Sequence, residues 1–255
     1  MGKRMIQAFM VLALLGIIAG CADTSDFNTM LKKAETGDHD AQFNLGVMYH
    51  DGDGVPQDYG KAVEWFSKAA DLGDAWAQFN LGVMYDDTGQ GVPQDYQKAL
   101  DWYSKAADQG HAPAQFNLGV MYGNGEGVPQ DYGKAVEWYS KAADQGDAWA
   151  QLNLGVMYHD GDDIPQDYQK AFHWFSKAAD QGDTRAQNNL GVMYEKGQGV
   201  ARNYVQAYKW FNLSVAQGDE NARENGERVL RIMTPAQIAE GQRLSRQFME
   251  RTQKE

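Results

Sequence analysis

The feature that most constrains this chain is a block of 36 residues that repeats along most of its length. The first copy begins at Ala41 and reads AQFNLGVMYHDGDGVPQDYGKAVEWFSKAADLGDAW. Self-similarity at a fixed period of this size is typical of solenoids, in which each unit buries its apolar face against its neighbours. One copy has 37 residues because its central loop carries one more residue. The sequence thus predicts five stacked repeats, at 41–76, 77–113, 114–149, 150–185 and 186–221.

Each repeat contains two stretches with helical patterns. In the first copy, Gly37-Asp38 precedes a helix expected over Ala41–Tyr49, since Gly ends one helix and Asp caps the start of the next. A turn with the sequence HDGDGVP follows, and its glycines and proline prevent helix continuation. Asp58 then caps a second helix, roughly Tyr59–Leu72, with apolar residues at helical spacing. The sequence predicts an all-α protein built from helix pairs.

Two residue types recur inside these helices and need a packing explanation. Glycine within a helix costs about 1 kcal/mol relative to alanine, so the glycine of each first helix indicates close approach of the paired helix. These glycines are Gly46, Gly82, Gly119, Gly155 and Gly191. A tryptophan recurs in each second helix, where core packing explains it better than ligand stacking. These tryptophans are Trp65, Trp102, Trp138, Trp174 and Trp210.

The recurring motifs resemble those of a known family. The pattern A-x-x-x-L-G-x-x-Y, then G-x-G-V, D-Y-x-K-A-x-x-W and A-A-D-x-G-D, is similar to the Sel-one-like repeat, a relative of the tetratricopeptide repeat. The match covers Ala41–Asn221 in five copies. The resemblance implies an α/α superhelical solenoid of antiparallel helix pairs, right-handed, that serves as a scaffold or adaptor for other proteins. Asp163 and Ala201-Arg202-Asn203 depart from the pattern locally.

The N-terminus has the features of a secretion signal. Lys3-Arg4 precede an apolar run from Ala8 to Ile18, which is too short to span a bilayer as a helix. Ile18-Ala19-Gly20-Cys21 resembles the bacterial lipobox, which implies cleavage of residues 1–20 and lipidation of Cys21. An ordinary signal peptide with an incidental cysteine is the alternative. By resemblance to enteric sorting rules, Ala22 favours the outer membrane, with the protein facing the periplasm.

Both ends of the repeat array are predicted to be capped. Residues 21–40 hold the lipidated cysteine, a short tether and a half repeat, because Asp26–Thr36 matches the second helix of a unit. Residues 222–255 hold a degenerate repeat and a last helix that starts at Thr234-Pro235 and ends near Arg251.

Charge restricts the partners that this chain can bind. The formal net charge is −12, and residues 21–221 carry thirty acidic against fourteen basic residues. Nucleic-acid binding needs a basic surface, so it is excluded as a role. We expect a monomer that meets the membrane only through the lipid on Cys21 and binds another protein or peptide.

One face of the first helices is the candidate binding site. At 100° per residue, Trp76, Phe79 and Val83 share an arc that resemblance to tetratricopeptide arrays places on the concave face. Aromatic rings supply contact area and amides bind peptide backbone, so this arc suits an extended peptide or a helix. The candidate residues are Phe43, Asn44, Val47, Trp76, Phe79, Asn80, Val83, Phe116, Asn117, Val120, Trp149, Leu152, Asn153 and Val156. The alternative is that these side chains pack between repeats.

No motif in the sequence indicates catalysis, a cofactor or a metal site. The turn at Asp51 resembles the opening of a calcium loop, but its twelfth position is Ala62 rather than the glutamate that calcium needs. Histidines lack zinc spacing, and we find no Ser-His-Asp arrangement or phosphate loop. The first alternative function is an immunity protein that neutralises an envelope-targeted toxin, since an acidic body suits a basic enzyme. A β-lactamase-like hydrolase is a remote alternative, because the related cysteine-rich proteins carry cysteine pairs in each repeat and this chain has none.

Overall fold

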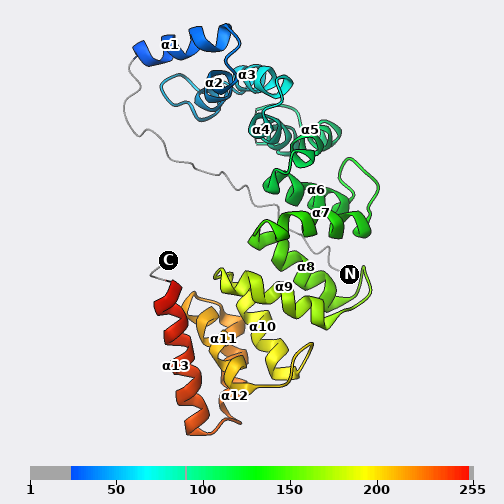
Figure 1. Cartoon of the computed structure of the whole chain (residues 1–255), viewed down its shortest axis with the longest axis vertical. Coiled ribbons are helices and arrows are strands. Elements are labelled where there is room, and N and C mark those ends of the chain that lie inside the picture. Colours follow the sequence, from blue (N-terminus) through cyan, green and yellow to red (C-terminus); the bar gives the residue numbers. More distant parts are fainter. Residues whose placement is uncertain (1–23, 90, 253–255) are drawn as a thin grey trace. The chain divides into compact units, whose positions relative to one another are not determined.

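The computed structural model describes residues 24–89 and 91–252, and every regular element within these ranges is a helix (Figure 1). The predicted signal sequence and Cys21 lie outside the described residues. The prediction of an all-α fold built from paired helices is confirmed. No helix in the described ranges is both long enough and apolar enough to cross a membrane.

The chain divides into two compact units, Met1–Gln145 and Gly146–Glu255. The described helices of the first unit are α1 (Thr24–Glu35), α2 (His39–Asp51), α3 (Tyr59–Asp71), α4 (Ala75–Asp86), α5 (Tyr96–Asp108), α6 (Ala112–Asn124) and α7 (Tyr132–Asp144). Those of the second unit are α8 (Ala148–Asp160), α9 (Tyr168–Asp180), α10 (Thr184–Lys196), α11 (Tyr204–Ala216), α12 (Glu220–Leu230) and α13 (Pro235–Thr252). Even-numbered helices from α2 to α10 are the first helices of their repeats, and each packs on the helix that follows it.

Helix boundaries follow the capping signals of the sequence. Asp38 accepts a hydrogen bond from the backbone N–H of Ala41 at 2.9 Å, and Asp58 accepts one from Lys61 at 3.0 Å. Gly52 ends α2 in the left-handed conformation, with φ of 75° and its N–H bonded to the Met48 carbonyl. The first helix is therefore two residues longer at each end than the predicted Ala41–Tyr49.

The glycine of each first helix lies against the ring of a fully buried aromatic residue in the paired helix. A Cβ added at Gly82 would lie less than 3.0 Å from the Tyr103 ring, and one at Gly119 would meet the Tyr139 ring equally closely. The same pairing joins Gly46 to Phe66, Gly155 to Phe175 and Gly191 to Phe211. Close helix approach, as predicted, is the reason for these glycines.

The recurring tryptophans of the second helices are packed to different extents. Trp65 and Trp210 are buried, which confirms the core prediction for these two. Trp102, Trp138 and Trp174 are partly buried, and in each a lysine three residues later lies over the ring. The lysine stem covers apolar surface there while its ammonium group contacts the ring face.

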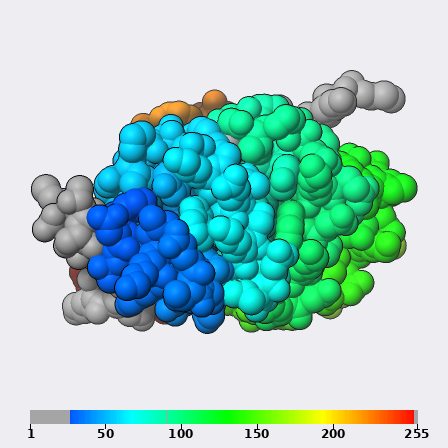
Figure 2. All heavy atoms as spheres, turned by 90° about the horizontal axis from the view of Figure 1, so that it is seen from above, coloured from blue at the N-terminus to red at the C-terminus, as the bar shows by residue number. Residues whose placement is uncertain are grey.

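Each unit has an additional helix outside its repeats, α1 packed on α2 in the first unit and α13 packed on α11 in the second. Figure 2 looks at the α1 end of the first unit, where α1, in dark blue, lies against the helices that follow it. Phe27 of α1 makes an edge contact with Tyr49 at 6.2 Å between ring centroids. In the second unit, Phe248 of α13 packs against Trp210 of α11 at 5.3 Å. Thr234 and Gln237 exchange hydrogen bonds at the start of α13, as a capping box does.

Candidate functional site

The first unit buries much of the predicted binding arc. Phe79 and Phe116 are each 6% exposed and Val120 is 3% exposed. Phe79 packs on Tyr103 with ring centroids 5.9 Å apart, and Phe116 packs on Tyr139 at 5.7 Å. Their rings thus fill the space between the two helices of a pair.

The other arc residues of the first unit keep more exposed surface. Phe43, Val47 and Val83 are partly buried, and Phe43 packs on Phe66. Asn44 is exposed, whereas the Asn80 side chain donates to the Trp76 carbonyl of its own helix at 2.8 Å. Asn117 is partly buried and is hydrogen-bonded to Tyr103.

In the second unit, Leu152 is 3% exposed, while Trp149, Asn153 and Val156 are partly buried. The sequence predicts an open apolar floor, but Phe79, Phe116, Val120 and Leu152 are buried and so do not form one. A binding role for the remaining arc residues stays a prediction.

Trp76 is the most exposed aromatic residue of the arc. It is the second residue of α4 and is 39% exposed. Its ring makes edge contacts with His111, at 4.4 Å between centroids, and with Phe79, at 6.5 Å. The ring is therefore held in place by its neighbours while part of it faces solvent.

His111 was not among the residues that the sequence singled out for a site. It caps α6, where the other first helices use aspartate, and its Nδ1 accepts the Ala114 backbone N–H at 3.3 Å. Burial lowers the pKa of His111 to about 4, so the imidazole is neutral at neutral pH. Because Nδ1 is the acceptor, Nε2 carries the hydrogen, and this buried atom has no hydrogen-bond partner in the described structure. His111 therefore places no positive charge beside Trp76.

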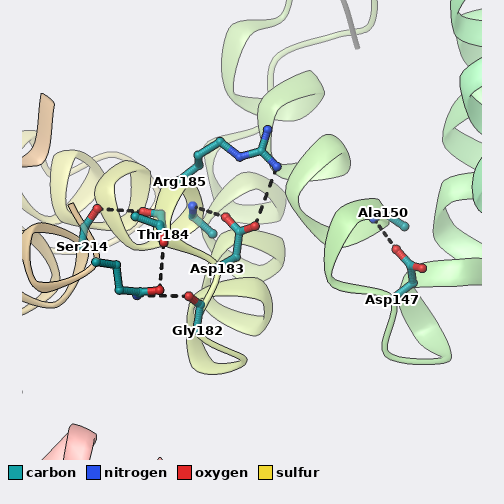
Figure 3. Close-up of polar contacts among 9 residues, drawn as sticks. Asp147, Ala150, Gly182, Asp183, Thr184, Arg185 and Ser214 are labelled. Carbon is teal, nitrogen blue, oxygen red and sulfur yellow. Dashed lines mark hydrogen bonds and ion pairs between the residues drawn. The ribbon is translucent and has the colours of Figure 1, made fainter. Parts of the chain in front are cut away.

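Trp149 occupies the equivalent position in α8 and is covered. The guanidinium carbon of Arg185, from the start of α10, lies 4.5 Å from the centre of the Trp149 ring. Figure 3 shows Arg185 beside Asp183, with a nitrogen-to-oxygen distance of 3.8 Å. Asp183 also accepts the Ala186 backbone N–H and so caps α10.

Contacts with α11 hold the start of α10 in place. The Ser214 hydroxyl donates to the Thr184 carbonyl at 2.9 Å (Figure 3). The amide of Gln217, directly after α11, donates to the Gly182 carbonyl at 3.2 Å. These bonds fix the turn that carries Asp183 and Arg185.

Buried glutamines connect neighbouring helices, a feature that sequence periodicity alone did not reveal. Gln78 donates to the Ala70 carbonyl of α3 and accepts from Gln109 at the end of α5. The same glutamine-to-glutamine bond recurs within the units between Gln145 and Gln115, Gln181 and Gln151, and Gln217 and Gln187. These bonds connect each repeat to the next within a unit.

Asp86 is an unusual carboxyl group at the end of α4. Its Oδ2 accepts the Tyr103 hydroxyl at 3.3 Å. Burial, and then repulsion by Glu126 and Asp87, raise the pKa of Asp86 to about 6, against a lowering by the Tyr103 hydrogen bond. Carboxyl groups with a raised pKa occur at catalytic sites, but they also occur where packing alone buries them.

A group of polar side chains, of which His39 and Asp40 are exposed and Asp74 is partly buried, gathers at the start of α2 and α4. His39 Nδ1 lies 3.3 Å from Asp40 and 3.8 Å from Asp74, and their donor atoms all lie within 4.8 Å of one another. Asp74 is already the cap of α4, bonded to the Ala77 N–H at 2.7 Å. Asp74 is thus engaged as a helix cap, and these side chains contact one another at the start of the two helices.

Comparison with known proteins supplies the family. A model described as Sel1 repeat matches residues 39–74, 77–111, 112–147, 150–183 and 184–219. None of the curated proteins matches the chain. A Sel1 repeat protein from Oxalobacter formigenes is 34% identical, with a TM-score of 0.71, and the match covers 81% of this chain and 60% of that one.

Two further solved structures are similar. A protective antigen present in uropathogenic Escherichia coli strains is 34% identical, with a TM-score of 0.55, over 89% of this chain and 56% of that one. The immunity protein Pa5087 from Pseudomonas aeruginosa is 29% identical over 83% of this chain and 80% of its own, with a TM-score of 0.44. This chain thus spans less than two thirds of the length of the Oxalobacter and Escherichia proteins. Since the family model matches more than half of the residues, the chain belongs to the Sel1 repeat family, whose helical solenoids are suited to protein–protein interaction.

Proposed function

We propose that this protein is a lipid-anchored scaffold or adaptor that binds a partner protein through the first-helix faces of its repeats and performs no catalysis itself. The observation that carries the proposal is Trp76, whose ring stays 39% exposed although the helix pairs around it bury most other large apolar side chains. Exposed tryptophan is enriched at the centres of protein interfaces. Asn44, on the preceding first helix, adds an exposed amide to the same arc.

The envelope location is part of the proposal and rests on the N-terminal sequence. Lys3-Arg4, the apolar run and the lipobox-like Ile18–Cys21 support a lipid anchor on Cys21 and an outer-membrane protein that faces the periplasm. A short tether would then hold the first repeats near the membrane surface.

Affinity capture from cells tests the binding role. Full-length protein and the variants Trp76→Ala and Ile232→Ala are each crosslinked in intact cells, purified and analysed for associated proteins. Ile232 is 58% exposed but lies outside the repeats, so it controls for the loss of exposed apolar surface. We expect a partner with the wild type and with Ile232→Ala that is lost with Trp76→Ala. Capture that is equal in all three proteins, or absent from all, contradicts the proposal.

A second candidate is an immunity role against a toxic enzyme in the envelope. Acidic residues outnumber basic ones in the repeats, and this charge suits a basic enzyme as the bound partner. The test co-expresses the chain with a basic toxin encoded beside it. Survival of these cells would support the immunity role, and equal killing with and without the chain would exclude it for that toxin.

A further inference from the structure

Equivalent positions in different repeats carry residues that interact with one another. The second residue of each first helix is Asp40 in α2, Trp76 in α4, Pro113 in α6, Trp149 in α8 and Arg185 in α10. In the second unit, two consecutive members of this series meet, because the Arg185 guanidinium lies over the Trp149 ring. The repeat geometry therefore places a residue of one repeat against the tryptophan of the repeat before it.

The Arg185 site has two components. The face of Trp149 attracts the guanidinium through its π electrons, and Asp183 supplies a carboxylate 3.8 Å away. Arginine suits such a site because its planar group stacks on an aromatic ring while its N–H groups pair with an anion.

The equivalent place in the first unit lacks its cation. The residue that follows Trp76 in the series is Pro113, which has no charge. Within residues 24–89 and 91–252, no lysine or arginine lies over the Trp76 ring. His111, which contacts the ring, is neutral. Trp76 is thus an exposed aromatic surface without the partner that Trp149 has.

Two carboxylates lie near the start of the helix that carries this exposed ring. Asp74 caps α4 two residues before Trp76, and His39 lies between Asp74 and Asp40, at 3.8 and 3.3 Å. The described part of the first unit carries 19 acidic and 8 basic residues. Three of those lysines, Lys68, Lys105 and Lys141, lie over tryptophans of their own helices. The counterpart of Asp183 in the first unit is His111, the cap of α6, so the negative charge that an arriving cation would find at the start of α4 is that of Asp74 and Asp40.

We infer that Trp76 is the docking point for an arginine side chain from a basic segment of the partner protein. The inference rests on the proposed function and names the chemistry of the partner. The ring contributes the stacking surface, Asp40 and Asp74 contribute negative charge, and the contacts with His111 and Phe79 hold the ring in the receptive orientation.

Titration with an oligo-arginine peptide amide tests the inference, with an oligo-citrulline peptide of equal length as the uncharged control. The readout is the indole N–H signal of Trp76 in NMR spectra of the full chain, assigned by its loss in Trp76→Phe. We expect the arginine peptide at low salt to shift this signal and the citrulline peptide to leave it unchanged. Equal shifts with both peptides, or no shift with either, overturn the inference.

Two variants use the equivalence of positions 113 and 185 in their repeats as a control. Pro113→Arg places an arginine where Arg185 stands in the second unit, so it should occupy the Trp76 ring and abolish the response to the peptide. Arg185→Ala should uncover Trp149 and add a response of its indole signal. A Trp76 response that persists at full size in Pro113→Arg overturns the inference, provided that thermal unfolding shows the variant folded. If partner capture still depends on Trp76 while the peptide has no effect, the binding role stands and only the arginine chemistry is wrong.

Discussion

The side-chain amide of Gln109 donates a hydrogen bond of 2.8 Å to Oε1 of Gln78, and Gln78 in turn donates to the Ala70 carbonyl of the preceding helix pair. This chain of bonds ties α3, α4 and α5 together through a buried amide. A buried amide with both its donor and its acceptor satisfied costs little, whereas one left unpaired destabilises the fold by about 1–3 kcal/mol.

The first repeat lacks one member of this network, which predicts a stabilising substitution. Leu72 stands where the later repeats have the donor glutamine and is 61% exposed. Gln42, the equivalent of Gln78, accordingly has a buried Oε1 without a partner in the described structure. Leu72→Gln should supply the missing donor and raise the free energy of unfolding by about 1 kcal/mol in urea titrations. Gln109→Leu is the reverse change and should lower the stability by about 1–3 kcal/mol. Equal stability of Leu72→Gln and Leu72→Ala would show that the added amide does not reach Gln42.

Two glycines that face different parts of the Phe211 side chain predict opposite effects of substitution by alanine. A Cβ at Gly191 would lie less than 3.0 Å from the Phe211 ring, whereas one at Gly226 would lie 3.6 Å from Phe211 Cβ, an ordinary contact. Gly191→Ala should therefore destabilise the second unit by about 1–3 kcal/mol through overpacking. Gly226→Ala should stabilise it by up to about 1 kcal/mol, because alanine favours helix. Differential scanning calorimetry of the two variants checks the order, and a more stable Gly191→Ala would contradict the close-packing explanation.

The raised pKa of Asp86 predicts a stability that falls as the pH rises. The Asp86 carboxyl group has a higher pKa in the folded chain than in the unfolded chain, where its pKa is near 3.8, so the folded chain holds this proton more tightly. Its unfavourable contribution is absent below about pH 4, grows as the pH rises through the folded pKa of about 6, and is complete above it. Asp86→Asn should thus raise the stability near neutral pH, by a few kcal/mol at most, and leave it unchanged near pH 4.

Asp108 provides the control for this experiment, since it is an exposed carboxyl group on the neighbouring helix α5. Urea titrations between about pH 4 and about pH 7.5 compare Asp86→Asn, Asp108→Asn and the wild type. A stability gain with Asp86→Asn that is the same at both ends of this range would rule out the proton-linked explanation.

The N-terminal motif predicts lipidation at Cys21. Cells supplied with radioactive palmitate should label the wild type, and Cys21→Ser should be unlabelled and should leave the membrane fraction. Ala22→Asp is a matched control that keeps the cysteine, and it should stay labelled but shift from the outer to the inner membrane. Release of an unlabelled wild type into the medium would show an ordinary signal peptide instead.

Local sequence signals made the fold predictable. The solvent exposure of the candidate site residues could not be predicted in the same way. Asp38, Asp58 and the Gly-Asp pairs act within a few residues, so helix number, order and limits followed from the sequence to within about two residues. The reason for Gly82 also followed, because glycine in a helix needs a neighbour that approaches closely. The burial of Phe79 did not follow, since helical spacing assigns a residue to a face but does not show how far the paired Tyr103 reaches toward that face.

His111 and the buried glutamines illustrate the same limit. A histidine in place of a capping aspartate looks like a local substitution, and its contact with Trp76 depends on the packing of α4 against α6. The bond from Gln109 to Gln78 spans 31 residues, so no local pattern predicts it. Comparison of the same position across repeats would have drawn attention to the histidine cap and to the glutamine series. Leu72 interrupts a series of glutamines, and His111 interrupts a series of aspartates.

Site-specific photocrosslinking in living cells tests the central claim most directly. A photoreactive amino acid is placed at Asn44, which is exposed on the first-helix face of α2, or at Glu64, which is exposed on the second helix α3 of the same pair. If the protein works by holding a partner on its first-helix face, irradiation gives a discrete crosslinked product from position 44 and none from position 64. Equal products from both positions, or no product from position 44 in cells that contain the protein at its natural level, would contradict it.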